Sequence, residues 1–184
     1  NGQMWYNSTD RVVKGVKKTL AGSWATGGTL NTSPGRFQLG GAGIQTAALA
    51  FGGGTQWPGV GVTGNTETYN GTSWSEVNDL NSSRRNLTGL GLQTAALGFG
   101  GGPPASALNE SWNGTSWTEV NDLNTARMTV AAAGTSTSAL GFGGAGSPGA
   151  YTESWNGSAW TEVSDLNTGS REGPGGFGAS NTSA

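Results

Sequence analysis

Carboxylates are the side chains in this sequence best suited to chemistry. The 184 residues include no histidine, the commonest general base and metal ligand, and no cysteine. Nine of the eleven acidic residues recur in three columns at a 43-residue step: Glu67, Glu110 and Glu153; Glu76, Glu119 and Glu162; and Asp79, Asp122 and Asp165. A general acid–base pair needs carboxylates in different environments that push their pKa values apart. Copies at equivalent positions share one environment, so we interpret the columns as scaffold and expect no catalysis.

One column stands close to an arginine in the sequence. Asp122 precedes Arg127 by five residues, so its side chain would either cap a turn or pair with that arginine or a neighbouring one. Calcium would need several hard oxygen ligands in a loop of characteristic spacing, and no such spacing is present. We therefore expect neither a metal site nor a cofactor.

Composition favours an all-β protein. The 35 glycines and the charged fraction of 11% are typical either of a disordered polar segment or of short strands joined by tight turns. Eight tryptophans favour strands, because disordered segments lack the aromatic surface needed to offset chain entropy. A net charge of −2 argues against a nucleic-acid partner, and no apolar run is long enough for membrane insertion.

A 43-residue repeat organises the chain. The stretch 112–127 returns almost unchanged from residue 155 and appears earlier from residue 69. Each unit predicts four short antiparallel strands: a small apolar segment, a second that runs into Phe-Gly-Gly, a third that ends in an aromatic residue and a fourth that ends in Glu-Val. Four short strands with a glycine and aromatic signature are typical of a propeller blade.

Two glycine signals predict the turns of each unit. Asn-Gly stands between the third and fourth segments, at 70–71, 113–114 and 156–157, and predicts a type I′ hairpin turn with positive φ at both central residues. The glycine pair after phenylalanine predicts a sharp turn and a close approach of neighbouring chain.

These units resemble the kelch repeat family. In one unit, the resemblance rests on Arg127, the apolar strand before Gly134, the sequence Phe142-Gly-Gly, and the aromatic pair Trp155 and Trp160. It covers residues 21–184 and implies a kelch-like β-propeller domain with three full units and a truncated fourth.

The sequence departs from the kelch pattern at three points. The separation of five positions between the two strand aromatics is slightly shorter than in the family, and the family's usual tyrosine is kept only at Tyr69. The arginine position also drifts, since Arg84 and Arg127 are in register, Arg171 is one place late and Arg36 is two places late.

A second resemblance concerns function. Residues 2–9, Gly-Gln-Met-Trp-Tyr-Asn-Ser-Thr, followed by tandem repeats rich in Asn, Thr and Gly, look like virion appendage proteins of tailed phages, especially those of aquatic hosts. This resemblance implies a non-catalytic virion protein such as a tail fibre, with other virion proteins or copies of itself as partners. Its loops would serve host attachment by binding surface glycans.

Two other functions compete with the virion hypothesis. One is a secreted or cell-surface bacterial module for carbohydrate binding or adhesion. The other is a galactose-oxidase-like enzyme, which is disfavoured because its copper chemistry needs histidine ligands.

The tryptophans divide into repeated and non-repeated positions. Six are in register and are expected to pack between blades: Trp24, Trp74, Trp112, Trp117, Trp155 and Trp160. Trp57 lies instead in the glycine-rich loop 54–64, which is about seven residues longer than its counterparts. We identify Trp57 as the candidate ligand-binding residue, stacking on a sugar or contacting a partner. The alternative is that its ring packs over the blade edge.

Residues 1–20 predict a basic β-hairpin ahead of the repeat domain. Apolar and β-branched residues at 3–6 and 11–16 flank the turn formers at 7–10. Four of the nine basic residues lie here: Arg11, Lys14, Lys17 and Lys18. They would either face anionic ligands or form a solvated face that protects a strand edge, and we favour the solvated face.

The repeat stops in mid-unit. Residues 179–184 align with the beginning of 134–140, and the strand that should follow is missing, so we expect a fragment of a longer polypeptide or a processed chain. Three full units are too few for a closed propeller, which needs roughly four or more blades. Closure would then require further residues, the N-terminal strands as part of a fourth blade, or neighbouring chains.

Overall fold

The structure, a computed structural model, describes residues 4–7, 12–15, 27–32, 35–56, 61–145 and 149–169. These residues form strands, turns and loops, and none of them is helical. The described part of the chain therefore contains no helix long and apolar enough to cross a membrane.

Three four-stranded antiparallel sheets account for the repeat and confirm the all-β fold of propeller-like blades. Blade 1 contains β3 (Gly40–Ile44), β4 (Ala47–Phe51), β5 (Thr66–Tyr69) and β6 (Trp74–Val77). Blade 2 contains β7 (Thr88–Leu92), β8 (Ala95–Phe99), β9 (Asn109–Trp112) and β10 (Trp117–Val120). Blade 3 contains β11 (Ala131–Thr135), β12 (Ser138–Phe142), β13 (Thr152–Trp155) and β14 (Trp160–Val163).

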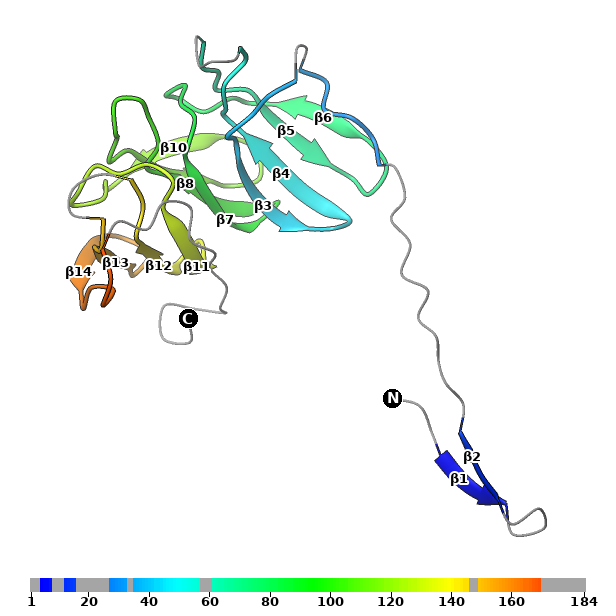
Figure 1. Ribbon diagram of the computed structural model, residues 1–184. Coiled ribbons are helices and arrows are strands. Elements are labelled where there is room, and N and C mark those ends of the chain that lie inside the picture. The colour runs from blue at the N-terminus through cyan, green and yellow to red at the C-terminus, as the bar shows by residue number, and fades with distance from the viewer. Residues whose placement is uncertain are drawn as a thin grey trace.

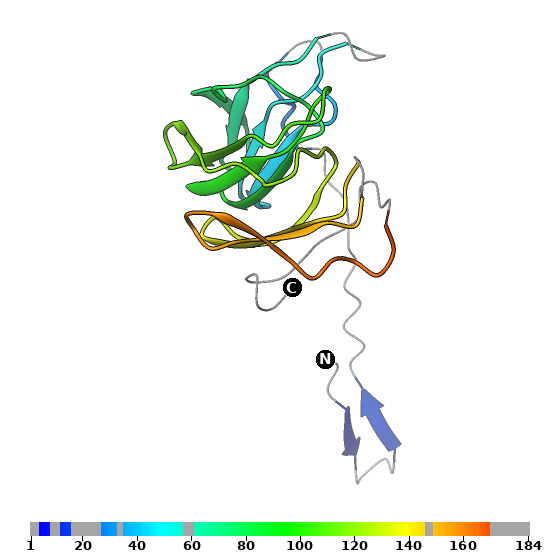
Figure 2. The same ribbon diagram turned by 90° about the vertical axis from the view of Figure 1, so that its left-hand side faces the viewer.

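The blades follow one another around an arc, with β7 lying between β3 and β11 (Figure 1). Strand order within each blade is sequential, so the first strand is innermost and the fourth is outermost. Figure 2 shows the blade 3 sheet, yellow to orange, beneath the two preceding sheets.

Burial explains the sequence pattern of the strands. All but the first residue of β8 are buried, because this strand lies inside a blade that is itself covered on both faces. Such a strand reads as a continuous apolar run. On the outermost strand β10 only Trp117 is buried, while Thr118 and Glu119 are exposed.

The hairpins between the third and fourth strands form as predicted, with Tyr69 opposite Trp74 in blade 1. The type I′ assignment is wrong, however. Only the glycine of each Asn-Gly pair has positive φ, as at Gly71 with +91°. Each connection contains four residues, and the Asn70 side-chain oxygen accepts the N–H groups of Thr72 and Ser73, both at 2.9 Å. Asparagine here caps the turn with its side chain.

The glycine pair after each phenylalanine behaves as predicted. Gly52 and Gly53 have φ of +66° and +111°, and Gly100 and Gly101 repeat these values closely. A Cβ atom on Gly100 would lie 2.7 Å from the Arg127 carbonyl oxygen at the start of the next blade. The glycine pair therefore allows a tight turn after the second strand and leaves room for the backbone that starts the next blade.

Two apolar clusters join the blades, as expected for the repeated tryptophans. The first brings Phe51 of blade 1 against Trp117 of blade 2, with ring centroids 4.6 Å apart. The second brings Phe99 of blade 2 against Trp160 of blade 3, at 4.8 Å. Trp112 and Trp155 belong to the same clusters, whereas Trp74 is only partly buried. Trp24 lies outside the described residues.

The N-terminal hairpin is present in the backbone. β1 (Met4–Asn7) pairs antiparallel with β2 (Val12–Gly15) and forms a sheet of its own. Its described strands pair with no strand of the three blades, so they add no fourth blade. Arg11, Lys17 and Lys18 lie outside the described residues, as does the predicted domain boundary at residue 20.

Replacing Gly100 with alanine tests the role of the glycine pair. We expect Gly100→Ala to lower the free energy of unfolding by about 2 kcal/mol or more, because alanine would adopt a left-handed φ beside a fixed carbonyl. Urea denaturation measures this loss.

Gly41→Ala is the matched control. A Cβ there would be 3.6 Å from its nearest heavy atom, so the change should be within about 0.5 kcal/mol. Equal losses in the two variants would contradict the assigned role of Gly100.

Candidate functional site

The first carboxylate column is buried and paired with arginine. Glu67, Glu110 and Glu153 are at most 1% exposed, and each binds the arginine that opens its own blade. Arg36 contacts Glu67 at 2.8 Å, Arg127 contacts Glu153 at 2.9 Å, and Arg84 contacts Glu110. Arg36 takes the same place as the other two although it is two positions late in the sequence. Arg171 lies outside the described residues.

Each arginine also contacts the loop between the second and third strands. In blade 3, Arg127 donates to the carbonyl oxygens of Gly143 and Tyr151, which stand at the two ends of that loop. In blade 1, Arg36 does the same with Gly52 and Asn65. In blade 2, Arg84 donates to the Gly100 carbonyl oxygen at one end only, and the Gly100 N–H donates to the Leu108 carbonyl oxygen at the other end at 2.9 Å. The base of each loop is therefore fixed, while its tip is free to differ between blades.

Each glutamate also receives the chain that arrives from the preceding blade. The Asn81 N–H donates to Glu110 and the Asn124 N–H donates to Glu153, both at 2.7 Å. The side-chain amide of Asn124 also donates to the Trp160 carbonyl oxygen at 3.0 Å. The glutamate thus connects the incoming loop, the arginine and the third strand.

These contacts explain the ionisation of Glu67. Burial by itself raises the pKa of this carboxyl. Hydrogen bonds from the Asn31 N–H and from the Thr32 hydroxyl, the charge of Arg36 and a further bond from the Thr32 N–H outweigh burial and hold the pKa below its ordinary value. The carboxylate is therefore charged at neutral pH and serves as a fixed acceptor.

The aspartate column caps strands. Asp122 accepts the N–H of Asn109, the first residue of β9, at 3.0 Å, and Asp79 and Asp165 make the same bond in their blades. Of the two alternatives for Asp122, the structure supports capping, since the ion-pair partner of Arg127 is Glu153.

The third carboxylate column is solvent-exposed. Glu76, Glu119 and Glu162 lie on the outermost strands, and Glu119 stands opposite the buried Glu110. Among the described residues, no three acidic side chains are grouped closely enough to hold a metal ion.

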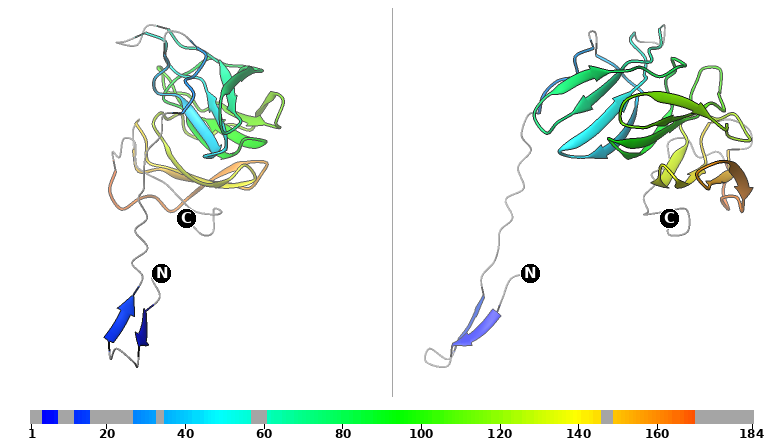
Figure 3. Two further views of the ribbon diagram at one scale, coloured as in Figure 1. Left: turned by 90° about the vertical axis from the view of Figure 1, so that its right-hand side faces the viewer. Right: turned by 180° about the vertical axis from the view of Figure 1, so that it is seen from behind.

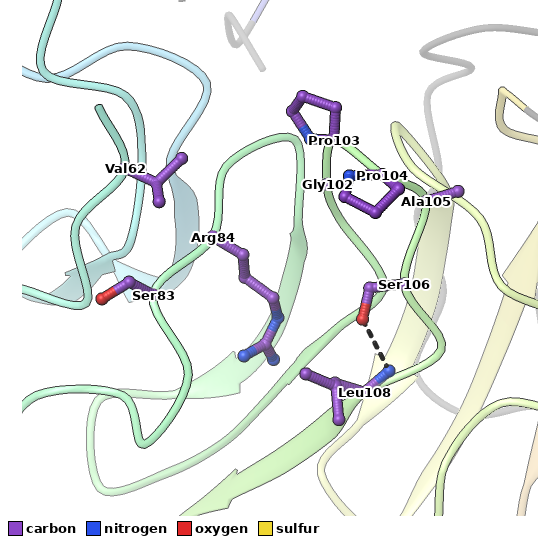
Figure 4. Close-up of a pocket in the computed structure, with 9 residues that line it drawn as sticks. All are labelled: Val62, Ser83, Arg84, Gly102, Pro103, Pro104, Ala105, Ser106 and Leu108. Carbon is purple, nitrogen blue, oxygen red and sulfur yellow. Dashed lines mark hydrogen bonds between the residues drawn. The ribbon is translucent and has the colours of Figure 1, made fainter. Parts of the chain in front are cut away.

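A cavity of about 300 Å³ lies between the loops of blades 1 and 2 (Figure 4). Blade 1 contributes Val62, and blade 2 contributes Ser83, Arg84, residues 102–106 and Leu108. Figure 4 shows Val62 and Ser83 across from the Pro103–Pro104 turn, with the Arg84 side chain between them. This volume is at the lower end of the range for small-molecule sites.

The lining of this cavity carries no free charge. The Arg84 guanidinium is 4% exposed and is held by the carbonyl oxygens of Gly98 and Gly100 as well as by Glu110. Ser106 accepts the Leu108 N–H at 3.1 Å, which leaves its hydroxyl proton able to donate. Apolar walls with a few hydroxyls suit an uncharged ligand rather than an ion.

The loop that carries Trp57 borders the cavity. Trp57 itself lies outside the described residues, so neither predicted position of its ring is tested. The flanking chain is described: the Thr55 N–H donates to the Gly61 carbonyl oxygen at 3.3 Å, and Val62 follows at the cavity wall.

The extra length of blade 1 is divided between two places. The β4–β5 connection covers residues 52–65, whereas its counterparts cover 100–108 and 143–151. The remaining extra residues lie between Asn31 and Arg36. The loop is therefore extended by less than the spacing of the tryptophans predicts.

Sequence reasoning overlooked the blade 2 side of the cavity. Pro103, Pro104 and Ser106 line it, yet none of them was predicted as a site residue. The two prolines break the repeat, since the residues at the 43-residue step from them are Gly146 and Ser147. Departure from the repeat, which identified Trp57 as a candidate, therefore also identifies this loop.

The fold and these contacts define an all-β repeat protein of propeller-like blades, in which two repeated carboxylate columns hold the scaffold together. No protein-family model matches the chain, and no curated protein matches it.

Removing one member of the buried pair tests its structural role. We expect Glu110→Ala to lower the free energy of unfolding by about 3–5 kcal/mol, because the Arg84 charge would be left buried without its partner. Chemical denaturation followed by tryptophan fluorescence measures the loss.

Glu119→Ala is the control, since it removes the same side chain from the exposed position directly across the strand pair. Its effect should be within about 0.5 kcal/mol. A Glu110→Ala effect no larger than that of the control would refute the structural role of the pair.

Proposed function

We propose that this chain is a non-catalytic structural or appendage protein of a tailed-phage virion, built from kelch-like blades, whose loops bind host-surface glycans. The virion assignment is supported by the resemblance carried by residues 2–9 and by the tandem repeats rich in Asn, Thr and Gly. The blade architecture is compatible with the kelch resemblance.

The observation that carries the binding proposal is the convergence of the non-repeated loops. The long β4–β5 loop of blade 1, which contains Trp57, and the Pro103–Pro104 loop of blade 2 border the same cavity. Loops that vary on a repeated scaffold are where repeat proteins place recognition.

The chemistry of the cavity supports an uncharged, hydroxyl-rich ligand. Arg84 is neutralised by Glu110, so neither an anion nor a cation would find a free partner on the wall. A sugar ring presents an apolar C–H face, which the prolines and Val62 can contact, and hydroxyl groups, which Ser106 can bind. Binding therefore requires no cofactor.

Protein mass spectrometry of purified phage particles tests the virion assignment. We expect peptides of this chain in the particles at a level comparable to other minor structural proteins. Recovery of the chain only in the surface or secreted fraction of a bacterium would instead favour the carbohydrate-binding or adhesion module.

Glycan-array binding tests the cavity. We expect Val62→Trp, which places a large ring in the cavity, to reduce binding about tenfold or more, and Trp57→Ala to reduce it through loss of stacking on the sugar. Thr118→Ala, an exposed change on the outer strand β10, is the control and should bind as wild type. Unchanged binding by Val62→Trp would contradict the proposed site.

A further inference from the structure

Arg85 differs from the other arginines that the structure describes. Arg36, Arg84 and Arg127 are buried, and each contacts a glutamate of its own blade. Arg85 is only partly buried, and none of the described carboxylates lies within ion-pair distance of its guanidinium. Its charge is therefore not neutralised by any acidic side chain of the described blades.

The guanidinium of Arg85 also makes none of the hydrogen bonds that the other three arginines make. Its Nε atom is buried and has no acceptor among the described residues. The terminal nitrogens Nη1 and Nη2 have no described acceptor either, and unlike Nε they are not buried. Two adjacent N–H-bearing nitrogens form a fork that matches the paired oxygens of a carboxylate.

An aromatic ring holds this guanidinium in place. The guanidinium carbon of Arg85 is 5.9 Å from the centroid of the Phe37 ring, over its face. The contact joins blade 2 to blade 1, whose sheets, green and cyan, lie side by side (Figure 3). An aromatic face attracts and orients a cation without accepting the hydrogen bonds at the edge of a guanidinium. Phe37 therefore positions Arg85 and leaves its fork for a ligand to bind.

Arg85 lies beside the cavity between blades 1 and 2. In blade 2, it stands directly opposite the cavity residue Gly102, whose N–H donates to the Arg85 carbonyl oxygen at 2.8 Å. In blade 1, Gly54 stands opposite both Phe37 and Val62, so the side chains of Phe37 and Val62 share one face. Val62 lines the cavity, and Phe37 lies two strand spacings away, or roughly 10 Å. The guanidinium over Phe37 therefore extends the wall to which Val62 belongs.

Arg85 also breaks the repeat. Phe37 and Met128 hold the same bridge position in blades 1 and 3, and both are apolar. The scaffold therefore does not require a charge at this position. The charge occurs in blade 2, whose loop contributes most of the cavity wall.

We infer that Arg85 is a specificity-determining residue that binds an acidic group of the glycan, so that the preferred host-surface glycans are acidic. This inference rests on the proposed glycan-binding function and deepens it. The sugar ring in the cavity is uncharged, and a neighbouring sugar unit presents a carboxylate or a sulfate to the terminal nitrogens of Arg85. The spacing of roughly 10 Å between Phe37 and Val62 is the reason for placing the acidic group on a neighbouring unit.

The surrounding charges limit the ligand to few acidic groups. Arg84, the nearest arginine in the sequence, is neutralised by Glu110, and the whole chain has a net charge of −2. A polyanion would need a run of cations to bind, which this cavity does not provide. One guanidinium suits one acidic group on an otherwise neutral glycan.

Matched glycans test this assignment. Each set on the array contains one oligosaccharide in three forms: neutral, with a uronic acid in place of one hexose, and with a sulfate ester on that hexose. We expect wild type to bind an acidic form at least about tenfold more tightly than the neutral form, and Arg85→Met to abolish this preference. Thr118→Ala should retain the preference. Comparison of the two acidic forms identifies which group Arg85 binds.

A salt titration tests whether charge carries the preference. The affinity for the acidic form should fall as NaCl is raised from about 50 to about 500 mM, whereas the affinity for the neutral form should not. Arg85→Lys keeps the charge but lacks the fork, so it should retain the salt dependence and bind the acidic form several-fold more weakly. A preference for acidic forms that does not respond to salt would contradict the role of Arg85.

Urea denaturation separates binding from folding. Arg85→Met loses no ion pair, and methionine holds the equivalent position in blade 3, so its midpoint should be within about 0.3 M of wild type. Arg84→Met leaves Glu110 buried without its partner and should lower the midpoint much further. Equal losses in the two variants would make Arg85 a structural residue and overturn the inference.

Two results distinguish this inference from the function on which it rests. Equal wild-type affinity for neutral and acidic forms, lost in Val62→Trp, would retain the glycan cavity and overturn the role of Arg85. Absence of binding to every form on the array would overturn both.

Discussion

The buried pair of arginine and glutamate is the interaction on which each blade depends. A charge removed from water is tolerable only when its partner and further hydrogen bonds are present, so the two residues must occur together in every unit. Through the pair, Glu153 holds both the loop that enters blade 3 and the guanidinium of Arg127. Arg127 in turn holds both ends of the loop between β12 and β13. A single ion pair thereby connects three segments that are distant in the sequence.

Packing between blades accounts for a composition that first seems too poor in apolar residues. Aromatic rings lie directly over backbone: a Cβ atom on Gly98 would be 2.7 Å from the Phe51 ring, and one on Gly141 would be 3.1 Å from the Phe99 ring. Glycine therefore contributes to the core by allowing a ring to approach the backbone closely, and Phe51 and Phe99 are fully buried between neighbouring sheets. A hydrophobic fraction of 33% is sufficient because a few large rings cover most of each junction.

This division of roles leaves the loops as the part of each blade that is free to vary. The glutamate and aspartate columns are used for ion pairing and strand capping, and the residues that hold a loop at its base leave the rest of the loop free to vary. Blades 1 and 2 differ from the repeat in adjacent loops, and these differences meet at one uncharged cavity.

The sequence by itself determined the all-β class, the four strands of each unit and the strand limits at Tyr69, Trp74 and their copies, because the 43-residue period and the glycine and aromatic positions are local signals. It also indicated that the acidic columns belong to the scaffold. Tertiary structure decided which carboxylate pairs with arginine, since Glu153 is much farther from Arg127 in sequence than Asp122 is, and only folding brings it close. Tertiary structure also forms the cavity, because Val62 and the Pro103–Pro104 turn belong to different blades and become neighbours only when those blades pack.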